Sequence, residues 1–355
     1  MATTPSDFVT EVTNMSNATA ALEAPATSAL DFVMVTFYGV ICALGLFGNV
    51  LVMWAILNHN HMRSAANWFI FNLSVADSLF LLGLPLTITT TLIKEWAFGG
   101  VACRLYFIVT SINQVTGAFT LTMMSLDRFF AVCCPIFAHN FRTMRYANVA
   151  ILIIWLTSLL FISPIILFAN VTPNGRGGDS CGVSWPSHSA VLGNRIYVIY
   201  TFLLSFAVPV VLICAFYVLI VLRLQRQSRV SNTQNRKDQT AKVTKLVGLV
   251  ISVFFVCWAP FWATQIYIIA NLTSKSFTPS KIEMVRYLIQ AFTILSYANS
   301  AMNPVIYAFT NNQFRNTFKK AFGMASVMSQ PDGRSRAPEH MTLMAKGVKE
   351  ENMAN

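Results

Sequence analysis

The chain has 355 residues, of which 55% are hydrophobic and only 11% are charged. An ordinary soluble domain carries about 25% charged residues, so this chain cannot cover its apolar surface with polar groups. The net charge of +11 raises the question of a nucleic-acid partner. The basic residues, however, lie in short segments on one side of alternating apolar blocks, where the positive-inside rule accounts for them, so we expect no nucleic acid.

The apolar residues form seven blocks, each long enough to span a membrane as a helix. A hydrocarbon core of about 30 Å requires ~20 mainly apolar residues. A soluble helix of that length would show a polar face at the 3.6-residue period, which these blocks lack. We therefore expect an all-α membrane protein, a seven-helix bundle with spans at about 31–58, 66–92, 101–133, 146–169, 194–222, 243–270 and 285–309.

The distribution of positive charge predicts the orientation of the bundle. Residues 1–62 contain no Lys or Arg, whereas Arg63, Arg142 and Arg145 lie in the first two loops on the other side, which is therefore expected to be cytosolic. We expect a multi-pass plasma-membrane protein with an extracellular N-terminus. No cleavable signal peptide is evident, so span one is expected to act as its own anchor. The outward segments hold the candidate glycosylation sites Asn14, Asn17, Asn170 and Asn271.

Four segments are expected along the chain. Residues 1–30 lack the apolar content to fold alone and are expected to form a flexible extracellular tail, followed by the bundle at 31–310. In 311–322, Phe314, Phe318 and Phe322 recur every four residues with basic residues between them, which is typical of an amphipathic helix lying on anionic lipid. Residues 323–355 are expected to be a disordered cytoplasmic tail.

The loop 170–194 is rich in Gly and Pro, which predicts a hairpin that forms a lid or rim over the bundle. Cys181 in this loop and Cys103 at the outer end of span three both face the oxidising side of the membrane, where disulfides persist. We therefore expect these two cysteines to pair. The other five cysteines lie inside spans or at their cytosolic ends, where they are expected to be apolar packing residues.

A carboxylate deep in a membrane span costs about 2.5–3.5 kcal/mol, which makes Asp77 a functional candidate. Its neighbours in other spans are expected to be Asn49, Asn113, Asn299, Ser300 and Asn303. A carboxylate with several amide oxygens can hold a sodium ion that modulates the protein; the alternative is an Asp satisfied by neighbouring amides alone. Three prolines interrupt spans five, six and seven and predict bends, either static or able to switch: Pro209, Pro260 and Pro304.

Over about residues 31–322 the chain resembles the rhodopsin-like G-protein-coupled receptors. The motifs that carry this resemblance are Gly48-Asn49-Val50, Leu73-Ser74-Val75-Ala76-Asp77, Cys103, Asp127-Arg128-Phe129, Trp155, Pro209, Tyr217, Phe254-Phe255-Val256-Cys257-Trp258-Ala259-Pro260 and Asn303-Pro304-Val305-Ile306-Tyr307. The resemblance implies that activation and G-protein coupling involve Asp127, Arg128, Tyr217, Phe254, Trp258, Asn303, Pro304 and Tyr307.

Within that family the chain looks like the cluster of somatostatin, opioid, melanin-concentrating-hormone and allatostatin-C receptors, and most like an allatostatin-C-type neuropeptide receptor. This placement depends on Ile112-Asn113-Gln114, Ser180-Cys181-Gly182-Val183-Ser184-Trp185-Pro186, Tyr200-Thr201-Phe202 and Ser296-Tyr297-Ala298-Asn299-Ser300. The resemblance implies a peptide ligand and coupling to inhibitory heterotrimeric G proteins. The alternatives are a receptor for another peptide or a small ligand, of the melanin-concentrating-hormone or opioid kind, and a membrane transporter.

By position in the resembling family, the candidate ligand contacts are Thr110, Gln114, Trp185, Gln265 and Gln290. The alternative for the three glutamines is plain solvation of a cavity wall. Thr110 replaces the acid that somatostatin and opioid receptors use to bind a ligand amine, so we expect no ammonium buried against span three. Gly117 replaces a hydroxyl beside Asp77, which predicts a weakened sodium site.

Other functions of a seven-span protein conflict with particular positions. A retinal-binding opsin needs a Lys in span seven, but Tyr297 occupies the matching position and 287–309 contain no Lys. A transporter would usually show an internal repeat or paired broken helices, and an intramembrane hydrolase would need paired catalytic groups. The sequence shows neither, so we expect no enzyme activity.

Overall fold

The computed structural model describes residues 28–136, 138, 142–174, 177–186, 190–228, 234–271, 279–310 and 312–321. The predicted flexible tails and the glycosylation sites Asn14 and Asn17 lie outside these residues. The chain divides into two compact units, residues 1–315 and 316–355. Most of the description concerns the first unit, which contains the helix bundle.

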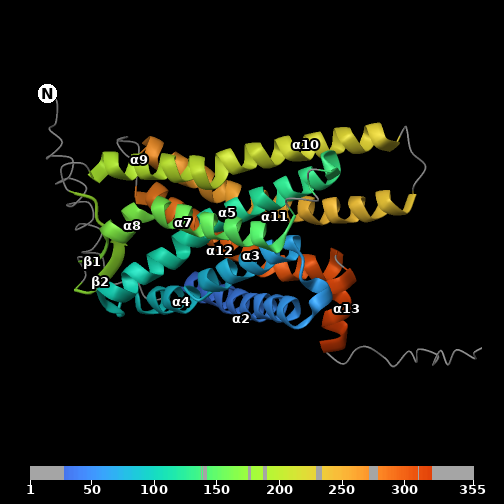
Figure 1. The fold of residues 1–355 in the computed structure, drawn as a ribbon. Helices are drawn as coiled ribbons and strands as arrows, with labels where there is room; N and C mark the ends of the chain where they lie inside the picture. The colour runs from blue at the N-terminus through green and yellow to red at the C-terminus, as the bar shows by residue number, and fades with distance from the viewer. Residues whose placement is uncertain are drawn as a thin grey trace, which may run out of the picture. The chain divides into compact units, whose positions relative to one another are not determined.

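The first unit is a closed bundle of helices (Figure 1). Its helices and strands are α2 (Ala29–Asn58), η1 (Asn60–Met62), α3 (Ala65–Leu81), α4 (Leu84–Ile93), α5 (Gly99–Cys133), α7 (Met144–Phe161), α8 (Ser163–Phe168), β1 (Ala169–Pro173), β2 (Asp179–Val183), α9 (Ala190–Phe202), η3 (Leu203–Ala207), α10 (Val208–Ser228), α11 (Gln234–Asn271) and α12 (Pro279–Thr310). A further helix, α13 (Asn312–Ala321), corresponds to the predicted amphipathic segment.

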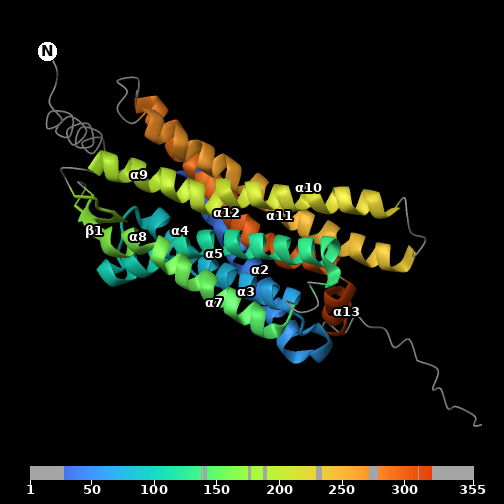
Figure 2. The same cartoon turned by 45° about the horizontal axis from the view of Figure 1, so that its top comes forward.

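Helix α5 runs through the middle of the bundle in both views (Figures 1 and 2) and packs against α3, α7, α10 and α11. Helix α12 packs against both α11 and α2, which closes the ring of helices. The interface of α2 with its neighbours is tight at Gly45, where an added Cβ would lie 2.7 Å from Leu81 Cδ1. A larger side chain at this position would push the helices apart.

The seven predicted spans correspond to α2, α3 with α4, α5, α7 with α8, α9 to α10, α11 and α12. Five segments are long and apolar enough to cross a membrane by composition alone: Ala29–Asn58, Ala65–Ile93, Met144–Phe161, Ala190–Arg226 and Gly248–Asn271. Helices α5 and α12 are long enough but more polar. They carry buried polar residues such as Asn113 and Asn303, and their positions inside the bundle shield these groups from lipid.

Prolines explain where several spans depart from a regular α-helix. Pro85 cannot donate a hydrogen bond to the carbonyl of Leu81, and α3 ends at that residue. The Cys42 thiol lies 3.7 Å from this freed carbonyl and donates to it. The π-helical turn η3 lies immediately before Val208 and Pro209, where the ladder also lacks a donor. The sequence predicted a bend at Pro209 but no interruption at Pro85.

Polar residues cap the helix starts. Ser28 and Asp31 form a capping box at the start of α2, and Asp31 also pairs with Lys94, with 2.7 Å between Oδ2 and Nζ. Ser64 and Thr143 accept hydrogen bonds at the starts of α3 and α7. The Asp31–Lys94 pair links the beginning of α2 to the end of α4.

The predicted hairpin between spans four and five is confirmed. Strands β1 and β2 are antiparallel, with Asn170 opposite Gly182 and Val171 opposite Cys181. Cys103 and Cys181 form a disulfide with a Cα–Cα distance of 5.6 Å, which ties β2 to the start of α5. We call the end of the bundle with this hairpin the hairpin end, and the opposite end the Arg128 end. Asn170, a predicted glycosylation site, is exposed on β1.

Candidate functional site

A cavity of about 340 Å³ lies at the hairpin end, between β2 and helices α5, α9, α11 and α12. Its lining residues are Phe80, Tyr106, Phe107, Thr110, Ser111, Gln114, Ile165, Val183, Trp185, Asn194, Tyr197, Val198, Thr201, Trp258, Phe261, Trp262, Gln265, Thr293, Ser296 and Tyr297. None of these is Asp, Glu, Lys, Arg or His. The wall therefore offers aromatic surface and neutral hydrogen-bonding groups to a ligand.

Four of the five predicted ligand contacts line this cavity: Thr110, Gln114, Trp185 and Gln265. The fifth, Gln290, does not. Thr293 and Tyr297 of α12 line the wall instead, and they lie on the same face of the helix as Gln290, three and seven residues further along. Gln290 is one turn nearer the hairpin end, and its role as a ligand contact stays a prediction.

The sequence prediction missed Trp262, which lines the cavity together with Trp258 and Gln265. These residues are spaced by four and three positions, so they share one face of α11. That spacing could have identified Trp262, because two members of the face were already candidates. Tyr106 and Tyr197 were also missed, and nothing in the spacing of the motifs singles them out.

The hairpin contributes one wall of the cavity through Val183 and Trp185. The indole of Trp185 packs between Phe168 and Tyr197, with ring centroids 5.0 Å and 5.6 Å away. Gly193 leaves room for it, because an added Cβ there would lie 3.2 Å from the Trp185 ring. The disulfide thus holds β2, and with it the cavity wall, in place.

Below the cavity, aromatic side chains connect its floor to the middle of the bundle. The Trp258 ring lies 6.3 Å from Phe80 and 6.3 Å from Phe254, measured between centroids. Phe254 in turn lies 6.0 Å from Phe206 in the π-helical turn η3. A displacement of Trp258 would therefore be transmitted by direct packing to η3 and to the α11 segment around Pro260.

Asp77 lies in the middle of the bundle and is only 1% exposed. Its carboxylate accepts hydrogen bonds from Asn113 (3.2 Å), Ser300 (2.7 Å) and Asn303 (2.7 Å). Ser300 is one of these donors, whereas no hydrogen bond joins Asn299, a predicted member of this group, to Asp77. Among the described residues no cation pairs with Asp77.

Several buried oxygens accompany Asp77 without a hydrogen-bond partner among the described residues. They include Ser74 Oγ, Asn299 Oδ1 and Asn303 Oδ1. Ser74 lies one helical turn from Asp77 on α3, and Asn303 donates to the carboxylate through its other amide atom. Oxygen atoms that accept no hydrogen bond, beside a carboxylate without a paired cation, are the kind of ligands that a hard cation prefers. Nearest to the Arg128 end, the buried Tyr307 hydroxyl also has no partner among these residues.

At the Arg128 end, Asp127 pairs with two arginines. Arg128 Nη2 lies 2.6 Å from Asp127 Oδ2, and Arg142 Nε lies 2.7 Å from Oδ1. Arg142 Nη2 donates to Oδ2 as well, at 3.3 Å, so its contact is bidentate. The Asp127 carboxylate is therefore shared between Arg128 and Arg142.

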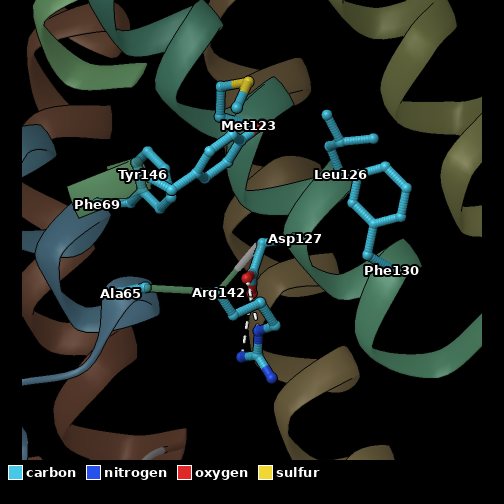
Figure 3. A pocket seen from close by; sticks show the side chains of 8 residues that line it. All are labelled: Ala65, Phe69, Met123, Leu126, Asp127, Phe130, Arg142 and Tyr146. Atoms are coloured by element: carbon cyan, nitrogen blue, oxygen red, sulfur yellow. Dashed lines mark hydrogen bonds and ion pairs between the residues drawn. The ribbon is translucent and has the colours of Figure 1, made fainter. Parts of the chain in front are cut away.

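Figure 3 shows the carboxylate of Asp127 facing the guanidinium of Arg142 beside a small pocket of about 20 Å³. The pocket wall is mostly apolar, with Phe69, Met123, Leu126 and Phe130. Arg142 is 37% exposed and Arg128 only 13% exposed, measured on the side chains. Tyr217 of α10 lies close enough to Arg128 to interact with it electrostatically. Of the predicted activation and coupling residues, Asp127, Arg128 and Tyr217 thus lie together at the Arg128 end, whereas Trp258 lines the cavity.

Asn303 and Pro304 bring α12 against the first two spans. Gly48 faces Pro304 so closely that an added Cβ would lie 2.9 Å from Pro304 Cβ. Asn49 Nδ2 donates to the carbonyl of Ser300 at 3.0 Å. The three predicted motifs around Asn49, Asp77 and Asn303 therefore form one connected polar region.

Comparison with known proteins agrees with this arrangement. Residues 48–307 match the model of the 7 transmembrane receptor (rhodopsin family). The chain is 36% identical to somatostatin receptor type 2 of Mus musculus over 301 residues, which covers 85% of this chain and 80% of that receptor. It is 38% identical to somatostatin receptor type 5 of Bos taurus over 305 residues, covering 86% of this chain and 80% of that receptor.

A third relative, somatostatin receptor type 4 of Rattus norvegicus, is 37% identical over 300 residues, covering 83% of this chain and 74% of that receptor. The chain is a seven-helix membrane receptor of the rhodopsin family and belongs, within that family, to the cluster of somatostatin receptors. This family consists of receptors rather than enzymes.

Proposed function

We propose that this receptor binds a neuropeptide of the somatostatin and allatostatin-C kind and activates inhibitory heterotrimeric G proteins. The observation that carries the proposal is the neutral, aromatic cavity of about 340 Å³ under a disulfide-tethered hairpin, with a buried arginine at the opposite end of the bundle. The names of the similar receptors favour a somatostatin-like peptide.

The hairpin end is the extracellular end in this proposal, and the receptor resides in the plasma membrane. Arg63, Arg142, Arg145, Arg223 and Arg226 lie at the Arg128 end, which the positive-inside rule assigns to the cytosol. The amphipathic helix α13 carries basic residues that would contact anionic lipid. The Cys103–Cys181 disulfide then lies on the oxidising side.

In the proposed mechanism the buried part of the peptide displaces Trp258, and Phe254 transmits the movement to the middle of α11. The bend at Pro260 allows the Arg128 end of α11 to swing away from α5. The opening would expose Arg128 to the G protein. The energy for this change must come from contacts that the peptide makes better in the active state than in the resting state.

The part of the peptide that lies deepest in the cavity should carry no charge. A desolvated ammonium without a counter-ion costs several kcal/mol, and the cavity wall holds no carboxylate. Thr110 occupies the place of the acid used by related receptors, and its hydroxyl donates to the carbonyl of Tyr106 at 2.8 Å. A disulfide-ringed peptide with aromatic, aliphatic or amide groups at its tip fits such a site, with its cations near Glu95 and Asp179 at the rim.

We further propose that a sodium ion modulates the receptor at Asp77. Asn113 and Asn303 bind the carboxylate, and the unpaired oxygens of Ser74 and Asn299 would add ligands. Gly117 has only Leu73 Cδ1 within 4 Å of an added Cβ and offers no hydroxyl, which favours weak binding. The sodium ion would only compensate the negative charge of the Asp77 carboxylate.

The test of the ligand class is a screen in cells that express the full chain. Disulfide-ringed peptides of the somatostatin and allatostatin-C kind are compared with opioid and melanin-concentrating-hormone peptides for suppression of cyclic AMP. We expect suppression by a ringed peptide that is abolished by pertussis toxin. Activity of a linear opioid peptide alone would favour the alternative ligand class, and cyclic AMP unaffected by the toxin would contradict inhibitory coupling.

A further inference from the structure

The indole of Trp262 is an unpaired hydrogen-bond donor in the wall of the cavity. Its side chain is only 4% exposed, and Nε1 has no hydrogen-bond partner among the described residues. The ring lies between Phe202 and Phe261, both with centroids 5.5 Å away and edge-to-face geometry. Neither neighbour can accept the N–H through a polar atom. A buried donor left in this state is unusual and destabilising.

Three hydroxyl donors of the same wall are already engaged. Thr110 donates to the carbonyl of Tyr106 at 2.8 Å, Thr201 to that of Tyr197 at 2.7 Å and Ser296 to that of Thr293 at 2.8 Å. These groups can accept a hydrogen bond from a ligand, but they do not need one. Trp262 differs from them because an indole N–H can only donate.

The other tryptophans for which the structure shows an indole hydrogen bond illustrate the contrast. Trp96 Nε1 donates to the carbonyl of Gly99 at 2.9 Å, and Trp155 Nε1 donates to Asn72 Oδ1 at 2.8 Å. At both of these positions, which lie outside the cavity, the indole N–H has a hydrogen-bond partner within the chain. The N–H of Trp262, in the wall of the cavity, has none among the described residues.

We propose that Trp262 recognises a hydrogen-bond acceptor, an amide carbonyl, on the buried segment of the peptide. The inference rests on the proposed function, because it names the chemistry that the same cavity selects. Nε1 is closed off from the cavity space at rest, so the ring must turn between its two aromatic neighbours to present the N–H to the ligand. Rotation of the ring allows the unpaired N–H of Trp262 to form a hydrogen bond with the ligand, which makes the bound state more favourable than the free state.

This arrangement selects for an acceptor rather than for apolar bulk. A ligand that fills the space without an acceptor would leave the indole unpaired, and a site built to form a hydrogen bond discriminates strongly against such an analogue. Gln265 lies three residues further along the same face and can both donate and accept. Trp262 and Gln265 together would recognise the two polar atoms of one peptide bond.

The test replaces Trp262 by 3-benzothienylalanine, in which sulfur takes the place of the N–H while the ring keeps its size. The probe is a radiolabelled allatostatin-C peptide on membranes containing the full chain. We expect the affinity to fall about tenfold, the effect of losing one buried hydrogen bond. The same replacement at Trp96, outside the cavity, should leave the affinity unchanged. Unchanged affinity of the Trp262 variant would overturn the proposal.

A measurement without ligand keeps the proposal testable if this peptide does not bind. The melting temperature of the purified Trp262 variant should equal or exceed that of the unmodified receptor, because an unpaired donor has been removed. The same replacement at Trp155 should lower it, because a hydrogen bond to Asn72 is lost. A Trp262 variant destabilised as much as the Trp155 variant would show that the N–H is already paired, which contradicts the inference. Failure of the unmodified receptor to bind the peptide would instead count against the proposed ligand class.

The acceptor on the ligand is located with thioamide peptides, in which one carbonyl oxygen at a time becomes sulfur, a weaker acceptor. We expect one position at which the thioamide lowers affinity for the unmodified receptor but not for the Trp262 variant. Equal losses in both receptors at every position would show that Trp262 does not contact a ligand carbonyl.

Discussion

The two carboxylates Asp77 and Asp127 lie in the same bundle but are neutralised in opposite ways. Asp127 pairs with two guanidinium groups at 2.6 Å and 2.7 Å, near the end of the bundle. Asp77 is 1% exposed and has three neutral donors but no paired cation among the described residues. One charge is compensated by the chain itself, whereas the other is bound, among the described residues, only by neutral groups.

This difference separates the tasks of the two sites. A carboxylate held by two arginines changes state when its partners move, so Asp127 responds to the conformation of the helices and of the segment that carries Arg142. A carboxylate held only by amides and a hydroxyl responds to the ions and protons available to it. The cavity at the hairpin end adds a third environment, in which no charged side chain lines the wall.

The largest expected effect concerns the hairpin that covers the neutral cavity. Cys181→Ser removes the bond to Cys103, so β2 loses its covalent attachment to α5. Loss of a native disulfide typically costs about 2–5 kcal/mol. We expect peptide binding at the cell surface to be lost, measured against an antibody stain for receptor abundance. Cys42→Ser, a cysteine outside the disulfide, serves as the control, and wild-type affinity of Cys181→Ser would refute the role of the hairpin.

The second effect concerns the packing that holds the polar region around Asp77 together. Gly45→Ala places a Cβ 2.7 Å from Leu81 Cδ1 and 3.1 Å from Ala301 Cβ. Overpacking of this kind costs about 1–3 kcal/mol and should lower the melting temperature of the purified receptor. Gly39→Ala in the same helix meets nothing within 4 Å and is the matched control. Equal melting temperatures for the two variants would mean that the helix contact is looser than it appears in the structure.

A third experiment distinguishes the two carboxylates by their response to salt. Asp77→Asn removes the charge that a sodium ion would compensate while keeping a side chain of the same shape. We expect the dependence of agonist affinity on sodium, measured against choline at constant ionic strength, to disappear. The Gly117→Ser variant should strengthen that dependence by adding a hydroxyl. A sodium effect that survives Asp77→Asn would place the ion elsewhere.

The smallest effect concerns the sharing of Asp127. Arg142→Ala removes the bidentate partner of Asp127. The Asp127 carboxylate then pairs with Arg128 alone, which strengthens the Asp127–Arg128 ion pair of the resting state. Because Arg142 is partly exposed, we expect basal nucleotide exchange to fall by only about two- to fivefold. Arg145→Ala, an exposed arginine without an ion pair among the described residues, should have no effect. A rise in basal exchange in Arg142→Ala would show that the shared pair stabilises the resting state instead.

The spans and the disulfide could be predicted because they depend on composition. Apolar length specifies a membrane helix, and the oxidising side specifies which cysteines pair, so Cys103 and Cys181 were identified correctly. The interruption after Leu81 was also readable in principle, because Pro85 removes the donor to that carbonyl. Four of the five ligand contacts predicted from family positions line the cavity.

The pairing of Arg142 with Asp127 could not be predicted. The two residues are separated by fifteen positions, and their contact depends on the path of the chain between α5 and α7 rather than on any periodic pattern. The role of Gln290 stays a prediction, because helical spacing identifies a face but not the depth at which a cavity ends. Helical spacing places Trp262 on the same face as Trp258 and Gln265, but its unpaired indole N–H becomes visible only once its neighbours are known.

The most direct test of the account is the separation of peptide binding from G-protein activation in one variant. Arg128 lies at the opposite end of the bundle from the cavity, so Arg128→Ala should retain peptide affinity, measured by competition binding on membranes. The same membranes, supplied with purified inhibitory G protein, should lose peptide-stimulated exchange of GDP for GTP. Retained binding with lost exchange is the result that the account predicts. Normal exchange in Arg128→Ala, at unchanged affinity, would contradict the assignment of the Arg128 end as the coupling surface.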